Sequence, residues 1–296
     1  MSTFWIVLTG ALVASSCSLV GCFLVLRKMA MIGDAISHSV LPGIVIAFLL
    51  SGSRDSLVML LGAAVVGLIT VLLIQLFHQS GVQSDASIGV VFTALFAIGI
   101  VLISLYTRNI DLDLDCVLYG EIAYVPWNTI EFAGMNIGPK AVWGVGLALL
   151  LNIALICGFY KQFKICSFDP MMAAAVGIPV ALFHYLLMGL VSVTTVASFE
   201  SVGAILVVGM LVVPPATAYL LTERLSRMLL YSVVIGSLCS ILGYYTAHLL
   251  DASIAGCMIS VAGCFFVAAF LFSPTHGIFW RRWKQRRMIR ETAADN

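Results

Sequence analysis

Asp34 and His38 are the residues of this chain whose types and spacing best suit the binding of a metal ion. They lie four residues apart in the segment MAMIGDAISHSVLPG, which runs from Met29 to Gly43. On a helix this spacing brings both side chains to one face. A carboxylate oxygen beside an imidazole nitrogen suits Mn²⁺, Zn²⁺ or Fe²⁺, whereas Ca²⁺ and Mg²⁺ prefer oxygen ligands alone. The pair therefore predicts a site for a divalent transition metal.

A simpler interpretation of the same pair is that Asp34 caps the start of a helix and His38 hydrogen-bonds to a neighbouring helix. Spacing alone does not separate the two interpretations. Ionisable side chains inside a membrane segment are costly, however, and usually face a cavity or pathway. Gly33, Pro42 and Gly43 permit a broken helix, and irregular backbone at membrane depth occurs where it lines a cavity. We therefore expect the pair to face a water-accessible passage.

Glu200 is a second acidic residue within a long apolar stretch, from Val180 to Leu221. One interpretation is that it is a further metal ligand, or a carboxylate at the entry of the same pathway. The other is that Glu200 is a water-exposed loop residue between two membrane spans. The sequence leaves both interpretations open.

The elements that position these residues are predicted to be membrane-spanning helices. Apolar residues make up 61% of the 296 residues and charged residues 10%, against about 25% charge in soluble domains. A span needs about 20 apolar residues. Candidate spans cover residues 4–26, 35–50, 56–77, 87–106, 141–160, 180–198, 202–221, 228–249 and 253–272. The second is short, and the sixth and seventh are separated only around residues 198–201. We expect an all-α polytopic membrane protein with eight or nine spans, one of them short and broken.

The basic residues predict which side of the membrane each connecting segment faces. If the N-terminus lies outside, outside segments hold only Arg54, Arg108 and Lys140 of the fifteen basic residues. Cytoplasmic segments of membrane proteins carry the excess of Lys and Arg. We therefore expect the N-terminus outside and the C-terminus inside. Residues 1–279 form the predicted transmembrane domain, and residues 280–296 form a basic cytosolic tail against membrane lipid.

The outside segment 107–140 is acidic. It contains Asp111, Asp113 and Asp115, followed by Glu121. These carboxylates either attract cations or dock an extracytoplasmic binding protein, or they are simply a solvated loop. The sequence does not decide among these roles.

The inside segment 161–180 contains a predicted short helix. Ser167 or Asp169 is its candidate cap, with Pro170 in the first turn and Gly177 at the end. Such a helix on the cytosolic face is suited to transmit force from a partner protein. An ordinary connector between two spans has the same composition.

Several functions lack their sequence signals. The chain contains neither a G-x-x-x-x-G-K-[ST] phosphate loop nor an H-E-x-x-H motif. It is therefore predicted not to be an enzyme, and any ATP hydrolysis belongs to another chain. The net charge of +1 gives no reason to expect nucleic acid as a partner. The eight cysteines form no C-x-x-C pair, which favours their role as small apolar residues.

Three stretches resemble the zinc/manganese/iron ABC transporter permeases, the inner-membrane subunits of bacterial metal importers. They are FLVLRKMAMIGDAISHSVLPGI at 23–44, SFDPMMAAAVGIPV at 167–180 and SFESVGAILVVGMLVVPPATAYLL at 198–221. They occur in the family's order, and the predicted spans between them fit. The resemblance covers nearly all of the chain.

The resemblance implies roles for individual residues. Asp34 and His38 match the family's D-A-x-S-H motif, which implies metal coordination on the permeation path. Glu200 matches the acidic residue of the S-F-E stretch and has a weaker implication of the same kind. The 167–180 stretch matches the region that meets the ATPase subunit. The implied coupling residues are Ser167, Asp169, Pro170 and Gly177.

The resemblance also implies an importer in the bacterial inner (plasma) membrane. Its implied partners are a cytosolic ABC ATPase subunit, an extracytoplasmic metal-binding protein and a second permease chain, identical or paralogous. Mn²⁺, Zn²⁺ or Fe²⁺ is the expected cargo, ATP binds the partner subunit, and no cofactor is held permanently. The alternative is a secondary metal carrier driven by an ion gradient, for which two candidate acids are few. A non-transporting membrane scaffold would leave the Asp34–His38 pair without a purpose.

Overall fold

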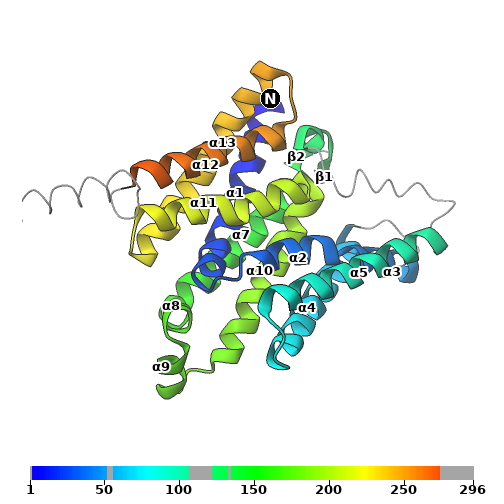
Figure 1. Cartoon of the computed structure of the whole chain (residues 1–296). Helices are drawn as coiled ribbons and strands as arrows, with labels where there is room; N and C mark the ends of the chain where they lie inside the picture. Colours follow the sequence, from blue (N-terminus) through cyan, green and yellow to red (C-terminus); the bar gives the residue numbers. More distant parts are fainter. Residues whose placement is uncertain (1, 52–55, 107–121, 133–134, 274–296) are drawn as a thin grey trace, which may run out of the picture.

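The computed structural model describes residues 2–51, 56–106, 122–132 and 135–273 (Figure 1). In this part of the chain, nine helical segments are long and apolar enough to cross a membrane. They are α1 (Ser2–Leu26), α2 (Met31–Ser39) with α3 (Leu41–Ser51) as one interrupted span, α4 (Ser56–Gln79), α5 (Ser84–Tyr106), α7 (Lys140–Gly158), α10 (Val180–Val202), α11 (Ala204–Leu221), α12 (Leu225–Leu250) and α13 (Ile254–Phe272). The prediction of an all-α polytopic membrane protein is confirmed.

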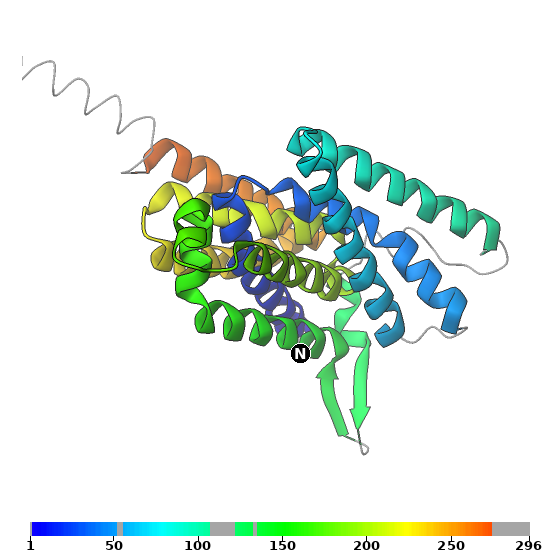
Figure 2. The same ribbon diagram turned by 90° about the horizontal axis from the view of Figure 1, so that it is seen from below.

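Helix α1 forms the centre of the bundle. It packs against α7, α10, α11 and α12, and its residues Val13, Ala14, Cys17 and Val20 are fully buried. Helices α3, α4 and α5 pack against one another and form a second group, to the right in Figure 2. Many large apolar side chains of α4 and α5 remain exposed, among them Leu61 and Leu105. Lipid is the solvent that such an apolar surface requires.

Two glycines allow α11 to approach α1 and α2 closely. A Cβ atom at Gly21 of α1 would lie 2.0 Å from the main-chain oxygen of Leu211 in α11. Pro215 has no N–H to donate to that oxygen, which therefore lacks its helical partner. A Cβ atom at Gly33 of α2 would lie 2.1 Å from Cδ2 of the same leucine. Leu211 thus contacts both α1 and α2 at positions where only glycine leaves room for it.

The two ends of the molecule carry different short elements. Near the N-terminus lie a short helix, η1 (Ile122–Trp127), and a hairpin of two antiparallel strands, β1 (Thr129–Phe132) and β2 (Met135–Pro139). Helices α8 (Tyr160–Phe168) and α9 (Pro170–Ala175) project at the opposite end (Figure 1). This arrangement is the one that the predicted topology requires, because the N-terminus and segment 107–140 are expected on one side and segment 161–180 on the other. Which end faces the cytoplasm stays a prediction.

Some sequence predictions need correction or lie beyond the description. The boundary between the sixth and seventh spans is at Gly203, whose φ of 80° turns the chain, and not at residues 198–201. The hairpin was not predicted. The acidic residues Asp111, Asp113, Asp115 and Glu121, and the tail 280–296, lie outside the described residues.

Candidate metal-ion site

A tight turn after α1 sets the start of α2. The N–H of Lys28 donates to the carbonyl of Val25 at 3.1 Å, and that of Met29 donates to Leu24 at 2.9 Å. This pair of bonds is the Schellman pattern, in which the residue at the turn takes a left-handed conformation. Lys28 does so, with φ of 58°. Helix α2 follows three residues later and is joined to α1 by a defined turn.

The second span is interrupted at Val40, two residues after His38. The N–H of Val40 donates to the carbonyl of Ile36 at 3.1 Å and closes α2. Pro42, two residues on, has no N–H to donate to the His38 carbonyl. The predicted broken helix is therefore confirmed, and the break leaves the carbonyl of a candidate ligand without its helical donor.

Asp34 and His38 contact each other on α2. His38 Nε2 lies 3.5 Å from Asp34 Oδ1. The cap position of α2 is Ala30, and no side chain caps this helix, so the interpretation of Asp34 as a cap is wrong. One carboxylate oxygen and one imidazole nitrogen thus lie together on a membrane-spanning segment.

Asp34 and His38 form the open side of an otherwise buried stretch, Ile32 to Val40. The His38 side chain is 34% exposed and that of Asp34 is 37% exposed. All the remaining residues from Ile32 to Val40 are buried. The two ionisable side chains are therefore neither packed into the protein core nor fully exposed, and their place on a passage stays a prediction.

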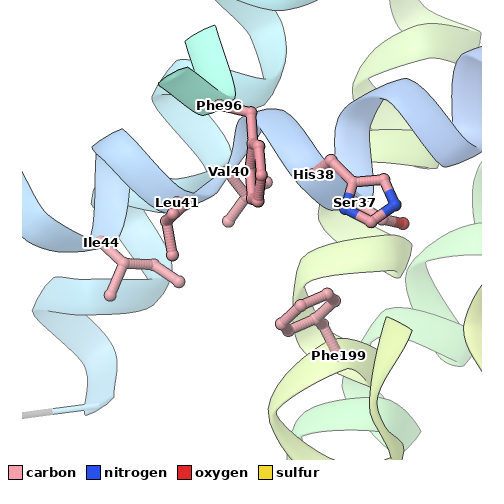
Figure 3. A pocket seen from close by; sticks show the side chains of 7 residues that line it. All are labelled: Ser37, His38, Val40, Leu41, Ile44, Phe96 and Phe199. Carbon is pink, nitrogen blue, oxygen red and sulfur yellow. The ribbon is translucent and has the colours of Figure 1, made fainter. Parts of the chain in front are cut away.

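A small pocket adjoins His38 (Figure 3). It is narrow, with room for little more than one water molecule, and is partly open to solvent. Its walls are Ser37, His38, Val40, Leu41, Ile44, Phe96 and Phe199. The Phe96 ring stands edge-on to His38 at a centroid distance of 5.8 Å, and Phe92 lies at 6.0 Å. Helices α2, α3, α5 and α10 thus meet around the imidazole.

Glu200 lies in the last turn of α10, one residue after Phe199, which lines this pocket. Its main chain is helical, so it is not a loop residue. Nothing is described of its side chain, and its part in metal binding stays a prediction. Among the described residues, no three or more of His, Cys, Asp and Glu come together as a metal site. The described site therefore rests on Asp34 and His38.

The predicted coupling residues lie together at the α8–α9 end. Asp169 caps α9, since its Oδ1 accepts a hydrogen bond of 2.9 Å from the N–H of Met172. Pro170 is the first residue of α9, and Gly177 ends the motif with φ of 85°. Ser167 is not the cap. It lies in the last turn of α8, where its Oγ accepts a hydrogen bond from Nε of Arg27 at 3.1 Å.

Two features of this region were missed from the sequence. Arg27 was counted only as an inside charge, although its side chain contacts the coupling segment. Phe92 and Phe96 reach His38 from a helix more than fifty residues along the chain, and no local signal marks them. Phe199 did carry a signal, because it lies beside the intramembrane acid Glu200.

Comparison with known proteins places the chain. The model of the ABC 3 transport family matches residues 2–273. The manganese transport system membrane protein MntD of Bacillus subtilis is 56% identical over 98% of both chains. The zinc transport system membrane protein TroD of Treponema pallidum is 41% identical over 94% of this chain and 76% of TroD. The solved structure of PsaBC from Streptococcus pneumoniae in complex with a Fab is similar with a TM-score of 0.78 at 32% identity, covering 95% of this chain and 94% of that one.

These likenesses agree with the nine apolar spans and the interrupted α2–α3 segment, which together describe a multi-pass protein of the bacterial plasma membrane. They also argue against the alternative function, a secondary metal carrier driven by an ion gradient. Because the family model matches almost the whole described chain and both curated relatives exceed 30% identity, this chain belongs to the ABC 3 transport family.

Proposed function

We propose that this chain is the membrane-spanning permease of an ATP-driven importer that carries a divalent transition metal into the cytoplasm. The observation that carries the proposal is the Asp34–His38 pair, 3.5 Å apart on the open side of a broken span. Its oxygen and nitrogen ligands suit Mn²⁺, Zn²⁺ and Fe²⁺. Mn²⁺ is the first candidate, because the relative with 56% identity is a manganese transport protein.

The proposed path uses few ligands. An extracytoplasmic binding protein delivers the ion to the outer face, the ion passes Glu200, and Asp34 and His38 hold it transiently. Two side chains from one permease chain bind weakly enough to let the ion leave, as conduction requires. Pro42 has no N–H to donate to the His38 carbonyl, and we propose this oxygen as a further ligand. ATP binding on a partner then moves segment 167–180 and alternates access.

The proposed partner surface is the α8–α9 end. Phe168, Met171 and Met172 lie there outside the candidate spans, with exposures of 56%, 83% and 61%. Exposed apolar groups in water mark interaction sites when they cluster. We assign this surface to a cytosolic ATP-binding cassette subunit. The complete importer would include a second permease chain, identical or paralogous.

Metal uptake tests the site directly. The D34A/H38A variant, co-expressed with its ATPase subunit and reconstituted in proteoliposomes, should lose uptake of ⁵⁴Mn²⁺ while the complex still assembles and binds ATP. The D85A/H78A variant is the matched control, because it removes the same two side-chain types from the exposed α4–α5 connection. Wild-type uptake by D34A/H38A would refute the assignment. Uptake that needs no ATPase subunit would instead favour a gradient-driven carrier.

A further inference from the structure

Arg27 joins the end of α1 to the coupling segment. Its Nε donates to Ser167 Oγ in α8 at 3.1 Å, and its Nη1 lies 3.5 Å from Nδ1 of His184 in α10. One guanidinium therefore contacts two elements that lie about 140 and 157 residues further along the chain. Helix α8 directly precedes α9, and α10 begins at Val180, so His184 lies in the first helical turns after α9.

The Arg27 guanidinium does not use all of its hydrogen-bond donors. Its Nη2 is buried without a hydrogen-bond partner, and within the described chain no carboxylate pairs with the guanidinium. Burial lowers the pKa of Arg27, and the nearby Cys166 opposes this shift. Arg27 as a whole is half-buried, and a charge that is partly removed from water is normally paired because leaving it unpaired costs free energy. Such violations of the packing rules are expected at functional positions rather than at purely structural ones.

The position of Arg27 connects two parts of the proposed mechanism. On one side, Ser167 lies two residues before Asp169, the cap of α9. On the other side, the turn at Lys28 leads directly into α2, which carries Asp34 and His38. This turn is held by its own main-chain hydrogen bonds, so a displacement of Arg27 reaches α2 without being absorbed by a loose loop.

We propose that Arg27 is the positioning residue that transmits movement of α8 and α9 to the metal-binding helix α2. The inference rests on the proposed function. Movement of α9 shifts Ser167, the guanidinium follows its acceptor, and the unpartnered Nη2 leaves a second arrangement of bonds available to the same side chain. Arginine suits this role because its planar fork presents several donors at once, whereas lysine presents one compact charge.

The test separates coupling from folding. R27K keeps the charge but lacks the fork, and S167A removes the Nε acceptor with little change in volume. K28Q is the matched control, because Lys28 is the exposed neighbouring cation of the same turn. Each variant is assembled with its ATPase subunit in proteoliposomes, and Mn²⁺ uptake and ATP hydrolysis are measured on the same sample.

We expect R27K and S167A to hydrolyse ATP at the wild-type rate while the Mn²⁺ ions taken up per ATP fall about fivefold or more, a modest coupling effect. The double variant R27K/S167A should take up no less Mn²⁺ per ATP than the more impaired single variant, because both substitutions remove the same Arg27–Ser167 contact. K28Q should match the wild type. Wild-type uptake per ATP in S167A, or equal losses of uptake and hydrolysis in both variants, would overturn the inference. If R27K fails to assemble, S167A alone decides.

D34A/H38A, measured alongside, keeps the two proposals apart. Normal uptake in that variant would defeat the proposed function itself. If D34A/H38A loses uptake while S167A keeps the wild-type Mn²⁺ uptake per ATP, only the proposed role of Arg27 is wrong.

Discussion

At the scale of single residues, we propose that His38 distinguishes one metal ion from another. Imidazole nitrogen favours Zn²⁺, whereas oxygen ligands suit Mn²⁺. The H38Q variant replaces the nitrogen ligand with an amide oxygen on a side chain of similar reach. We expect Zn²⁺ to become a poorer competitor of Mn²⁺ uptake by about tenfold, the size of effect that perturbing a metal-site residue commonly has.

The measurement is the Zn²⁺ concentration that halves ⁵⁴Mn²⁺ uptake. D34N is the informative comparison, because the loss of a negative charge should weaken the binding of Mn²⁺ and Zn²⁺ equally. If H38Q weakens Mn²⁺ uptake and Zn²⁺ competition equally, the imidazole does not set the selectivity between the two metals.

The sequence could predict the chemistry of this pair but not its surroundings. Residue type and four-residue spacing suffice to place Asp34 and His38 on one face. The rings of Phe96 and Phe199 come from distant helices, and their approach to His38 depends on tertiary packing. The Arg27–Ser167 bond is of the same kind, because its partners are 140 residues apart.

At the scale of helices, close packing of α1 on α11 depends on the missing side chain at Gly21. A Cβ atom there would lie 2.0 Å from the main-chain oxygen of Leu211, which cannot move like a side-chain tip. We expect G21A to destabilise the protein by about 1–3 kcal/mol, the usual cost of overpacking. A lower midpoint of thermal unfolding in detergent would measure it.

G146A is the control for this substitution, because nothing lies within 4 Å of a Cβ at Gly146 of α7 and alanine is the better helix former. Its unfolding midpoint should equal or exceed that of the wild type. If G21A also unfolds like the wild type, α1 and α11 do not rely on this approach.

Apolar runs predicted the helices well because a span is defined by length and hydropathy alone. The broken second span was predictable from Gly33, Pro42 and Gly43, which act locally. The boundaries between spans were harder to predict from the sequence. The turn at Gly203 requires a left-handed residue, whereas the polar residues at 198–201, where the sequence analysis placed it, remain helical. The β1–β2 hairpin lay in an outside segment that was analysed only for its charge.

At the scale of the whole molecule, the candidate metal site and the proposed partner surface are separate. The Asp34–His38 pair lies within a membrane-spanning segment, whereas α9 projects beyond the spans at the end opposite the N-terminus. In the proposed mechanism, movement at α9 reaches the metal-binding helix through α8 and the α1–α2 turn, and α10 also contacts both α9 and α2. An interface defect at α9 should consequently abolish uptake while leaving the metal ligands intact.

The exposed apolar surface of α9 gives the test of this separation. Met171 is 83% exposed, and M171D would place a carboxylate where the ATPase subunit is proposed to dock. We expect co-purification of that subunit to fall at least about tenfold, as at an interface hot spot worth about 2 kcal/mol. S226D is the matched control, because it adds the same charge at an exposed position on the side predicted to be cytosolic. Retained ATPase binding in M171D with loss in S226D would move the docking surface to the α11–α12 connection.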